Sequence, residues 1–372
     1  MAPLHRGLPD EIAICEILIR LDPKALLRCR AVCRSWLRAT STREFLVVHH
    51  GRQPTLPLLN GYNGDVDDQT LDIIPLDHQT GLVASDQLQS IARLDGMHLL
   101  RSCDGLLILC TNNMDDRHYA ICNPATRQYA PLRQIDDFEV SGMYLHRSTG
   151  EYRLLLYPWP ARVMNAELPH GLHDGCHVFT LGSCEPPRHI GWPEAREVMF
   201  EANVLFRGSL LWYMGPENIK KDIIRVFDTT AESFRHMQAP VLPGPGEANL
   251  FEIDGMLTIA SCNDAAATIG IWVLQNYESE VWTLKCQIRL PAEVPKFDGG
   301  WDVLVTCLDE DVLVLVLFGH MILQIDIDGK LVATLHGGLS RDPLRCLVSW
   351  LVLNILDVRI LMGWSMYDLD EL

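Results

Sequence analysis

Hydrophobic residues near the start of the chain recur with the period of an α-helix. Ile14, Ile17, Leu18 and Leu21 lie three or four residues apart, so they fall on one face of a first helix. Pro9 suits the first turn of this helix, because its missing N–H would have no hydrogen-bond partner there. The spacing predicts a short amphipathic helix that ends near Leu21.

Two more helices are predicted directly after the first. Asp22 is a favourable N-cap and Pro23 a favourable first residue for the second helix. The third helix carries a further apolar stripe, made of Cys29, Val32, Cys33, Trp36 and Leu37. Three short helices enclose only a very small core. We therefore expect this module to need a partner that covers its apolar surface.

The pattern changes after the first fifty residues to short runs that are typical of β-strands. Each run is bounded by Gly, Pro, Asn or Asp, and long helical periods are rare. Clear examples are residues 106–110, 153–157, 209–213 and 312–316. A mainly-β domain is therefore expected to follow the helical start.

A strand–turn–strand unit recurs along this β domain. Its copies are spaced about 45–55 residues apart and begin at Ile121, His177, Val226, Ile271 and Ile322. Hairpins with an X-Gly turn lie between the copies, in residues 205–212 and 251–257. This period is typical of the four-stranded blades of a kelch-like β-propeller. A generic pair of β-sandwiches is the alternative.

Charge differs between the two parts of the chain. Residues 1–50 carry eight Lys/Arg against five Asp/Glu, which leaves a formal net charge of −20 for the remainder of a chain whose total is −17. An acidic main domain argues against binding to a nucleic-acid backbone as the main activity. The mildly basic first module favours an acidic protein partner, chiefly through the association rate.

The cysteines and the N-terminus indicate the compartment. There are twelve cysteines, no Cys-x-x-Cys pair and no Asn-x-Ser/Thr acceptor. Most of the cysteines sit inside apolar runs, which is typical of reduced, buried thiols. No long apolar segment precedes a cleavage site near the N-terminus. We expect a protein of the nucleus, the cytoplasm or both, with no membrane partner.

The first module also resembles a known family. Residues 8–11, Leu-Pro-Asp-Glu, and the string LDPKALLRCRAVCRSW of residues 21–36 are similar to the F-box, over roughly residues 8–48. The resemblance implies a small all-α, three-helix domain. The stretch from Leu8 to Leu21 is one residue longer than the commonest form of the family. The sequence therefore leaves open which face the first helix presents.

The resemblance implies docking on a Skp-family linker protein, and through it on the cullin–RING core of an SCF-type E3 ubiquitin ligase. The residues that it assigns to this contact are Leu8, Pro9, Ile12, Ile17, Leu18, Leu21, Pro23, Leu26, Val32, Cys33 and Trp36. The chain would then be a non-catalytic adaptor that holds an unknown protein substrate for ubiquitination.

The long domain resembles the F-box-associated domain of plant F-box proteins. The similarity rests on residues 102–107, followed by 123–127, and on residues 271–274 with Trp282. It implies a kelch-like propeller as the substrate receptor. We expect an F-box domain in residues 1–50, a linker and first strands in 51–97, the propeller in 98–340 and a divergent apolar C-terminal segment in 341–372.

Motifs of catalysis and cofactor binding are missing from the sequence. No nucleophile elbow, Walker loop, zinc-protease motif or dinucleotide fingerprint is present, so we predict no catalytic residues and no cofactor. Residues 169–177 gather three His, one Cys and one Asp, but no second ligand pair accompanies them, and we predict no metal site. The alternatives to an adaptor are a propeller receptor for a small molecule or glycan and, less favoured, a propeller enzyme.

Substrate contacts are expected in the Pro/Gly-rich loops of the propeller. Trp159 and Trp301 are aromatic residues in or beside such loops, and aromatic residues are favoured anchors in interfaces. Packing of both indoles inside the blades is the alternative. Residues 347–356 are apolar and uncharged, but too few to span a bilayer. A last blade strand or a helix packed on the propeller is expected there.

Overall fold

The computed structural model describes most of the chain in separate stretches. The described residues are 10–50, 52, 55–62, 68–73, 76–77, 81–82, 89–95, 97–111, 117–124, 128–158, 175–191, 203–214, 223–242, 248–253, 255–263, 266–291, 302–308, 311–318, 321–336, 348–352 and 367–368.

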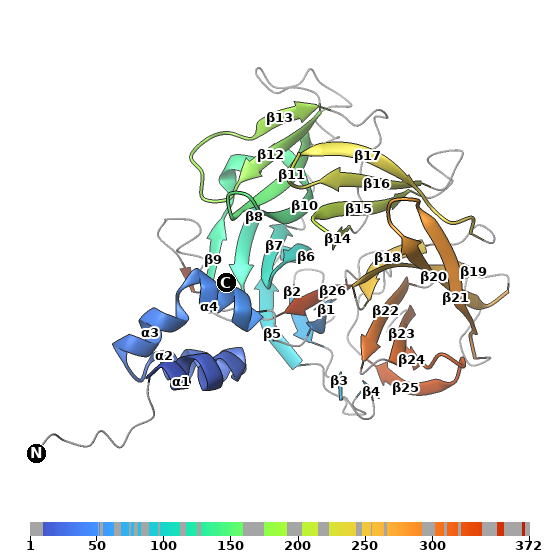
Figure 1. The fold of residues 1–372 in the computed structure, drawn as a ribbon, viewed down its shortest axis with the longest axis horizontal. Helices are drawn as coiled ribbons and strands as arrows, with labels where there is room; N and C mark the ends of the chain where they lie inside the picture. The colour runs from blue at the N-terminus through green and yellow to red at the C-terminus, as the bar shows by residue number, and fades with distance from the viewer. Residues whose placement is uncertain are drawn as a thin grey trace, which may run out of the picture.

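The chain begins with a small helical domain (Figure 1). Its helical segments are α1 (Asp10–Ile12), η1 (Ala13–Ile17), η2 (Leu18–Arg20), α2 (Pro23–Arg30), α3 (Arg34–Thr40) and α4 (Arg43–His50). The first three run on without interruption as one helix. Asp22 caps α2 as predicted, because its carboxylate accepts a hydrogen bond from the Ala25 N–H at 2.9 Å. The helical domain is confirmed. The predicted stripe from Cys29 to Leu37 does not lie on one helix, because α2 ends at Arg30 and α3 begins at Arg34, after its N-cap Cys33. Helix α4 adds a helix that the sequence pattern did not indicate.

A β-propeller follows the helical domain, as predicted. The described strands form five four-stranded sheets and one five-stranded sheet, arranged as blades around a common centre (Figure 1). A separate two-stranded ribbon joins β3 (Leu76–Asp77) to β4 (Gly81–Leu82). The generic pair of β-sandwiches is therefore excluded.

The strands of each blade are named from the inner edge of the sheet to its outer edge. The first contains β26 (Val348–Val352), β1 (Thr55–Tyr62), β2 (Asp68–Ile73) and β5 (Gln89–Asp95); the second contains β6 (Met97–Cys103), β7 (Leu106–Thr111), β8 (Tyr119–Asn123), β9 (Gln128–Pro131) and β27 (Tyr367–Asp368). The third contains β10 (Phe138–His146), β11 (Glu151–Pro158), β12 (Cys176–Thr180) and β13 (Arg188–Gly191), with the short helix η3 (Arg133–Ile135) before it. The fourth contains β14 (Val204–Phe206), β15 (Ser209–Met214), β16 (Ile223–Asp228) and β17 (Ser233–Gln238); the fifth contains β18 (Ala248–Ile253), β19 (Met256–Asn263), β20 (Thr268–Asn276) and β21 (Val281–Arg289); the sixth contains β22 (Asp302–Leu308), β23 (Asp311–Phe318), β24 (Met321–Ile325) and β25 (Leu331–His336).

The recurring sequence unit corresponds to the outer half of each blade. Its copies begin at the third strands β8, β12, β16, β20 and β24, and each leads through a turn into the fourth strand. The X-Gly hairpins supply the two inner strands, β14 with β15 and β18 with β19. Each copy of the unit therefore corresponds to one blade, because every blade contains the same series of strands and turns.

The C-terminal segment closes the ring. Strand β26 pairs antiparallel with β1, so that Leu58 lies opposite Ser349. Either a strand or a packed helix was expected in this segment, and its residues 348–352 form a strand. The first blade thus combines strands from both ends of the propeller, which ties the last part of the propeller to its start.

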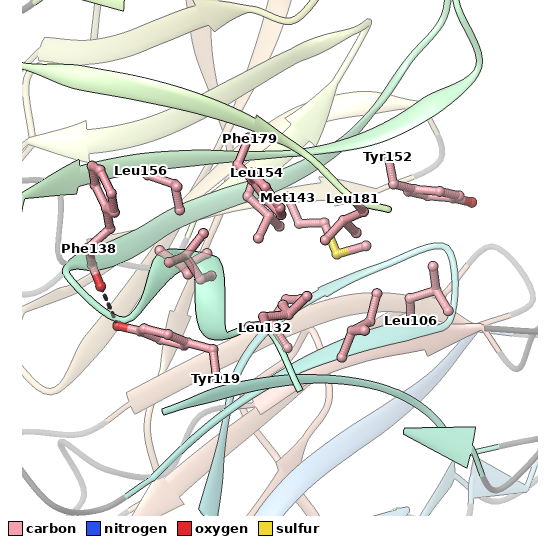
Figure 2. Close-up of a cluster of buried hydrophobic side chains, with 14 of the residues drawn as sticks. Leu106, Tyr119, Leu132, Phe138, Met143, Tyr152, Leu154, Leu156, Phe179 and Leu181 are labelled. Carbon is pink, nitrogen blue, oxygen red and sulfur yellow. Dashed lines mark hydrogen bonds between the residues drawn. The ribbon is translucent and has the colours of Figure 1, made fainter. Parts of the chain in front are cut away.

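The core lies between neighbouring blades. Leu106, Ile108 and Leu154 are fully buried in one cluster that joins the second blade to the third (Figure 2). The Tyr119 hydroxyl donates a hydrogen bond to the Phe138 carbonyl at 2.8 Å across the same contact. Similar clusters follow between the later blades. Packing between sheets therefore fixes the blades and leaves their turns free to carry polar groups.

Candidate protein-docking site

The first helix contains a widened turn within the stretch that is one residue longer than in the commonest F-box. Residues 13–17 form a π-helical turn, and the N–H of Leu18 donates to the carbonyls of Ala13 and Ile14. A bond that spans five residues takes up one more residue than an α-helical bond. The extra residue is therefore absorbed inside the helix, so the start of the helix and its end at Leu21 need not shift.

A miniature core holds the helical domain together. Leu18, Ile19, Leu26, Phe45 and Leu46 are buried in it. Helix α4 supplies the last two of these side chains, so this unpredicted helix completes the core. Leu21 and Trp36, which we predicted as contact residues, pack partly buried against the same cluster.

Polar contacts fix the ends of the helices. The buried His49 ring nitrogen Nε2 lies 2.8 Å from the Leu21 carbonyl, which ties α4 to the end of the first helix. The Arg30 guanidinium donates to the side chain and carbonyl of Thr40, and this joins α2 to the end of α3. These contacts connect residues 10 to 28 positions apart. They hold the surface of the domain in one arrangement.

Apolar side chains are concentrated on the outside of this domain. Of the large hydrophobic side chains exposed in the described residues, five of twelve belong to residues 10–50. They are Ile12, Ile17, Val32, Leu37 and Val48. Val32 is 67% exposed. Exposed apolar groups gathered on so small a domain are typical of a protein contact.

Some of the predicted docking residues are exposed and others are buried. Ile12, Ile17 and Val32 face outward; Leu18 and Leu26 are buried, so they support the surface from below. The exposed Cys33 caps α3, with its sulfur 3.4 Å from the Trp36 N–H, and Pro23 opens α2. Leu8 and Pro9 lie outside the described residues. The sequence missed Val48, because α4 was not predicted; its apolar position in that helix was the available signal.

Exposed positive charges lie near Val32 in the sequence. Arg28, Arg34 and Arg38 are all exposed on α2 and α3, while Asp and Glu are absent from residues 23–42. The helical domain thus exposes both apolar and basic side chains. Such a combination suits a partner with an acidic surface.

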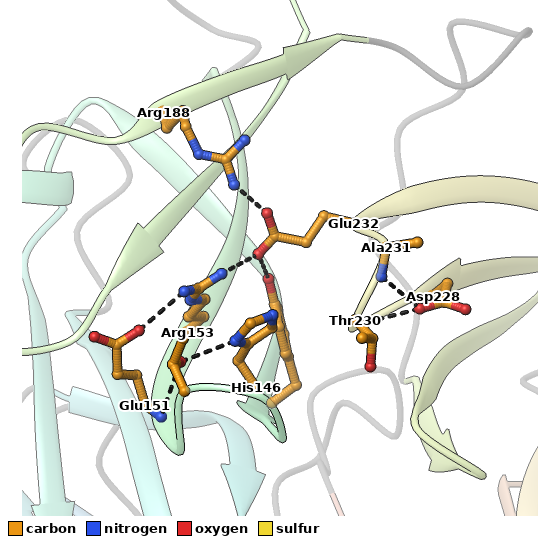
Figure 3. Close-up of polar contacts among 10 residues, drawn as sticks. His146, Glu151, Arg153, Arg188, Asp228, Thr230, Ala231 and Glu232 are labelled. Atoms are coloured by element: carbon orange, nitrogen blue, oxygen red, sulfur yellow. Dashed lines mark hydrogen bonds and ion pairs between the residues drawn. The ribbon is translucent and has the colours of Figure 1, made fainter.

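A different polar network joins two blades of the propeller. Glu232 lies in the turn between β16 and β17 and accepts hydrogen bonds from Arg153 at 2.7 Å and from Tyr144 at 2.8 Å; Arg188 forms a further ion pair with it (Figure 3). Burial opposes the charge of Glu232, but the bonds from Arg153, Tyr144 and Arg188 outweigh it and lower its pKa. A similar carboxylate, Glu280, links the next two blades through Arg235 and the Gln238 N–H. These contacts are structural.

We expect Glu232→Gln to lower the free energy of unfolding by about 2 kcal/mol, because Arg188 loses its carboxylate partner and Arg153 keeps Glu151 alone among the described carboxylates. Since folding lowers the pKa of Glu232, its contribution is complete above the ordinary Glu value of 4.5 and disappears as the pH falls through the lowered value. Denaturant unfolding at pH 7 and at low pH measures both effects. Glu278→Gln, at an exposed position of the next blade, is the control. Equal stability of wild type and Glu232→Gln at pH 7 would contradict the assignment.

The sites predicted in loops of the propeller are only partly described. Trp159 and Trp301 lie outside the described residues, as do His170, His173 and Asp174. Of the same histidine-rich loop, Cys176 is buried and His177 contacts the Gly175 carbonyl at 2.9 Å. No group of His, Cys, Asp and Glu that could hold a metal ion occurs in the part of the chain that the structure describes.

Buried thiols of the propeller are poor nucleophiles. Burial raises the pKa of Cys110, Cys122 and Cys176 to about 12, so these thiols are protonated at neutral pH. Among the described residues, no helix is long and apolar enough to cross a membrane.

A small helical domain with an outward apolar surface, followed by a closed ring of β-sheets, defines a two-module propeller protein. Family comparisons assign both modules: residues 6–47 match the F-box-like family, and residues 69–317 match the family described as F-box associated beta propeller domain. The second match covers more than half of the chain. The chain therefore belongs to the F-box-associated β-propeller family.

Individual relatives agree with this assignment. The chain is 27% identical to the F-box protein At5g49610 of Arabidopsis thaliana, over 76% of this chain and 79% of the relative. It is 23% identical to the F-box protein CPR1 of the same plant, over 86% of this chain and 82% of the relative. Among solved structures, a nidogen/laminin complex is similar over 81% of this chain and 100% of the matched chain, at 12% identity and a TM-score of 0.44.

Proposed function

We propose that this protein is the substrate-recognition adaptor of an SCF-type cullin–RING ubiquitin ligase. Proteins with an F-box are generally non-catalytic adaptors, and an F-box implies a Skp-type partner in general. In this chain the helical domain would dock on the Skp-family linker, and the propeller would hold the substrate near the ubiquitin-loaded enzyme. The chain would then contribute proximity and orientation rather than chemistry. We propose that it acts in the nucleus, the cytoplasm or both.

One observation carries the proposal. The helical domain exposes Ile12, Ile17 and Val32 although its total core is only a handful of side chains. Apolar groups left outside so small a core are costly in water and favourable in a contact. The exposed Arg28, Arg34 and Arg38 of the same domain favour an acidic partner surface.

Ubiquitin transfer should depend on the complete ligase. A mixture of the full-length chain, linker, cullin–RING core, E1, E2 and ubiquitin should modify the chain itself, because adaptor lysines are held near the loaded E2. Omission of the cullin–RING core should reduce this signal to background. Immunoblotting for ubiquitin conjugates measures both. Robust conjugation without the core, by the chain with E1 and E2 alone, would show a catalytic activity of its own and refute the adaptor assignment.

A further inference from the structure

One hairpin turn of the propeller carries an unusual residue. Arg207 and Gly208 connect β14 to β15, with φ angles of 48° and 77°. This is the form of a two-residue hairpin turn whose first position favours Asn, Asp or Gly. The corresponding turn of the second blade, Asp104–Gly105, has φ angles of 49° and 80° and the expected Asp. In the fifth blade the sequence again has Asp before Gly255. Arginine at this position costs about 1 kcal/mol of backbone strain.

Two arginines share one aromatic ring beside this turn. The guanidinium carbon of Arg207 lies 5.6 Å from the ring centre of Tyr277 and 5.3 Å from that of Phe206. The guanidinium carbon of Arg235 lies 5.1 Å from the Tyr277 ring centre. Tyr277 follows β20 in the next blade. Contacts of this kind hold a cation in place without neutralising its charge.

A third arginine approaches the same turn from the preceding blade. Arg147 lies in the turn between β10 and β11, and its guanidinium carbon is 4.0 Å from the place that a Cβ on Gly208 would occupy. In a four-stranded antiparallel blade, the turn between the first two strands and the turn between the last two lie at the same end. The arginines of two successive blades and Tyr277 of the next blade therefore lie at one end of the propeller.

The charges of this cluster are only partly balanced. Arg235 has a carboxylate partner, Glu280, at 3.4 Å, and that carboxylate also accepts from the Gln238 N–H. Arg147 and Arg207 are both exposed, and neither forms an ion pair with any described carboxylate. Both side chains approach the same turn without a described counter-ion, and an anion bound there would be attracted by both charges. They are found on a part of the chain whose formal net charge is −20.

We propose that Arg147, Arg207 and Arg235 form a recognition site for an anionic side chain of a partner protein. Guanidinium groups bind oxyanions through paired hydrogen bonds, and clustered arginines are a recurring means of binding phosphorylated or acidic motifs. The anion is therefore a phosphate monoester or a carboxylate on an exposed peptide segment. That this partner protein is the ubiquitination substrate rests on the function proposed above. The anion-binding site itself does not depend on that function.

The test compares three labelled peptides of one flexible Gly/Ser sequence with phosphoserine, glutamate or serine at the central position. Binding to the full-length chain is followed by fluorescence anisotropy at two salt concentrations. We expect saturable, salt-sensitive binding of an anionic peptide and none of the serine peptide. The phosphoserine and glutamate arms distinguish the two sources of the anion.

The variant Arg207→Asn gives the sharpest readout, because Asn suits the turn better than Arg. We expect it to weaken binding at least about tenfold, the loss of a charge-assisted contact, while its thermal midpoint stays equal or rises. Lys285→Gln, which removes one exposed charge from β21, should leave binding unchanged. The proposal is wrong if no anionic peptide binds, if Arg207→Asn binds like wild type, or if both variants lose affinity equally. Because no linker protein is present, failure here leaves the docking prediction untouched.

Discussion

Replacement of Val32 by Asp should abolish capture of a Skp-family linker protein while the helical domain stays folded. Val32 is 67% exposed and lies just after α2, so the substitution disturbs no core contact. In an apolar interface the new carboxylate would lose its hydration without gaining a partner. We expect affinity to fall about 100-fold or more, which corresponds to roughly 3 kcal/mol. A pulldown of linker and cullin by the full-length chain measures the effect.

The propeller offers a matched control for this variant. Val241 is 85% exposed and lies after β17, far along the chain from the helical domain. Val241→Asp makes the same chemical change and should leave capture of the linker unchanged. Equal recovery of the linker by wild type and Val32→Asp would remove Val32 from the docking surface. Equal losses with both variants would show that the effect is not specific to the helical domain.

Removal of residues 341–372 should open the propeller. Strand β26 is the inner strand of the first blade and pairs with β1, so its loss exposes the β1 edge and leaves the ring without closure. The missing hydrogen bonds and packing amount to several kcal/mol. For a domain of this size we expect the thermal midpoint to fall by about 10 °C or more. Thermal unfolding followed by circular dichroism measures the shift.

A shorter truncation separates closure from a general effect of shortening. Removal of residues 361–372 deletes only β27 among the described strands, a two-residue addition at the outer edge of β9. We expect a change of less than about 3 °C, because the four inner strands of that blade remain. If the two truncations lower the midpoint equally, closure by β26 is not the stabilising contact.

The sequence predicted the parts of the fold that depend on local patterns. Asp22 and Pro23 indicate the start of α2, because the hydrogen bond that caps the helix forms within one turn of the chain. The repeated strand–turn–strand units reveal the propeller because each blade repeats the same turn chemistry. The docking surface is recognisable only as a family pattern, since exposure cannot be inferred from spacing alone.

The sequence pattern could not predict features that depend on contacts between residues far apart in the chain. Helix α4 is held by the contact between His49 and the Leu21 carbonyl, 28 residues apart. The apolar run around β26 was compatible with a strand or a helix, and its partner β1 lies almost at the other end of the chain. Glu232 has the sequence context of a solvated turn residue, yet it binds arginines 79 and 44 positions away. Such pairings arise only when the blades pack.

The widened turn in the first helix shows the same limit. The sequence reveals one extra residue between Leu8 and Leu21, but any turn of the helix could have absorbed it. The structure places it at residues 13–17, between the exposed Ile12 and the buried Leu18. A helix with a π-turn presents its two halves at a different relative rotation than a regular helix does. Ile12 and Ile17 are the exposed large hydrophobic residues among those described in this helix.

The most direct measurement is the mass of the complex in solution. The purified full-length chain is mixed with a purified Skp-family linker and analysed by size-exclusion chromatography with light scattering. We predict a stable complex that contains one copy of each protein and that binds the cullin–RING core in a second run. Separate elution of the two proteins at micromolar concentration, with the chain folded by circular dichroism, would contradict its assignment as an SCF adaptor.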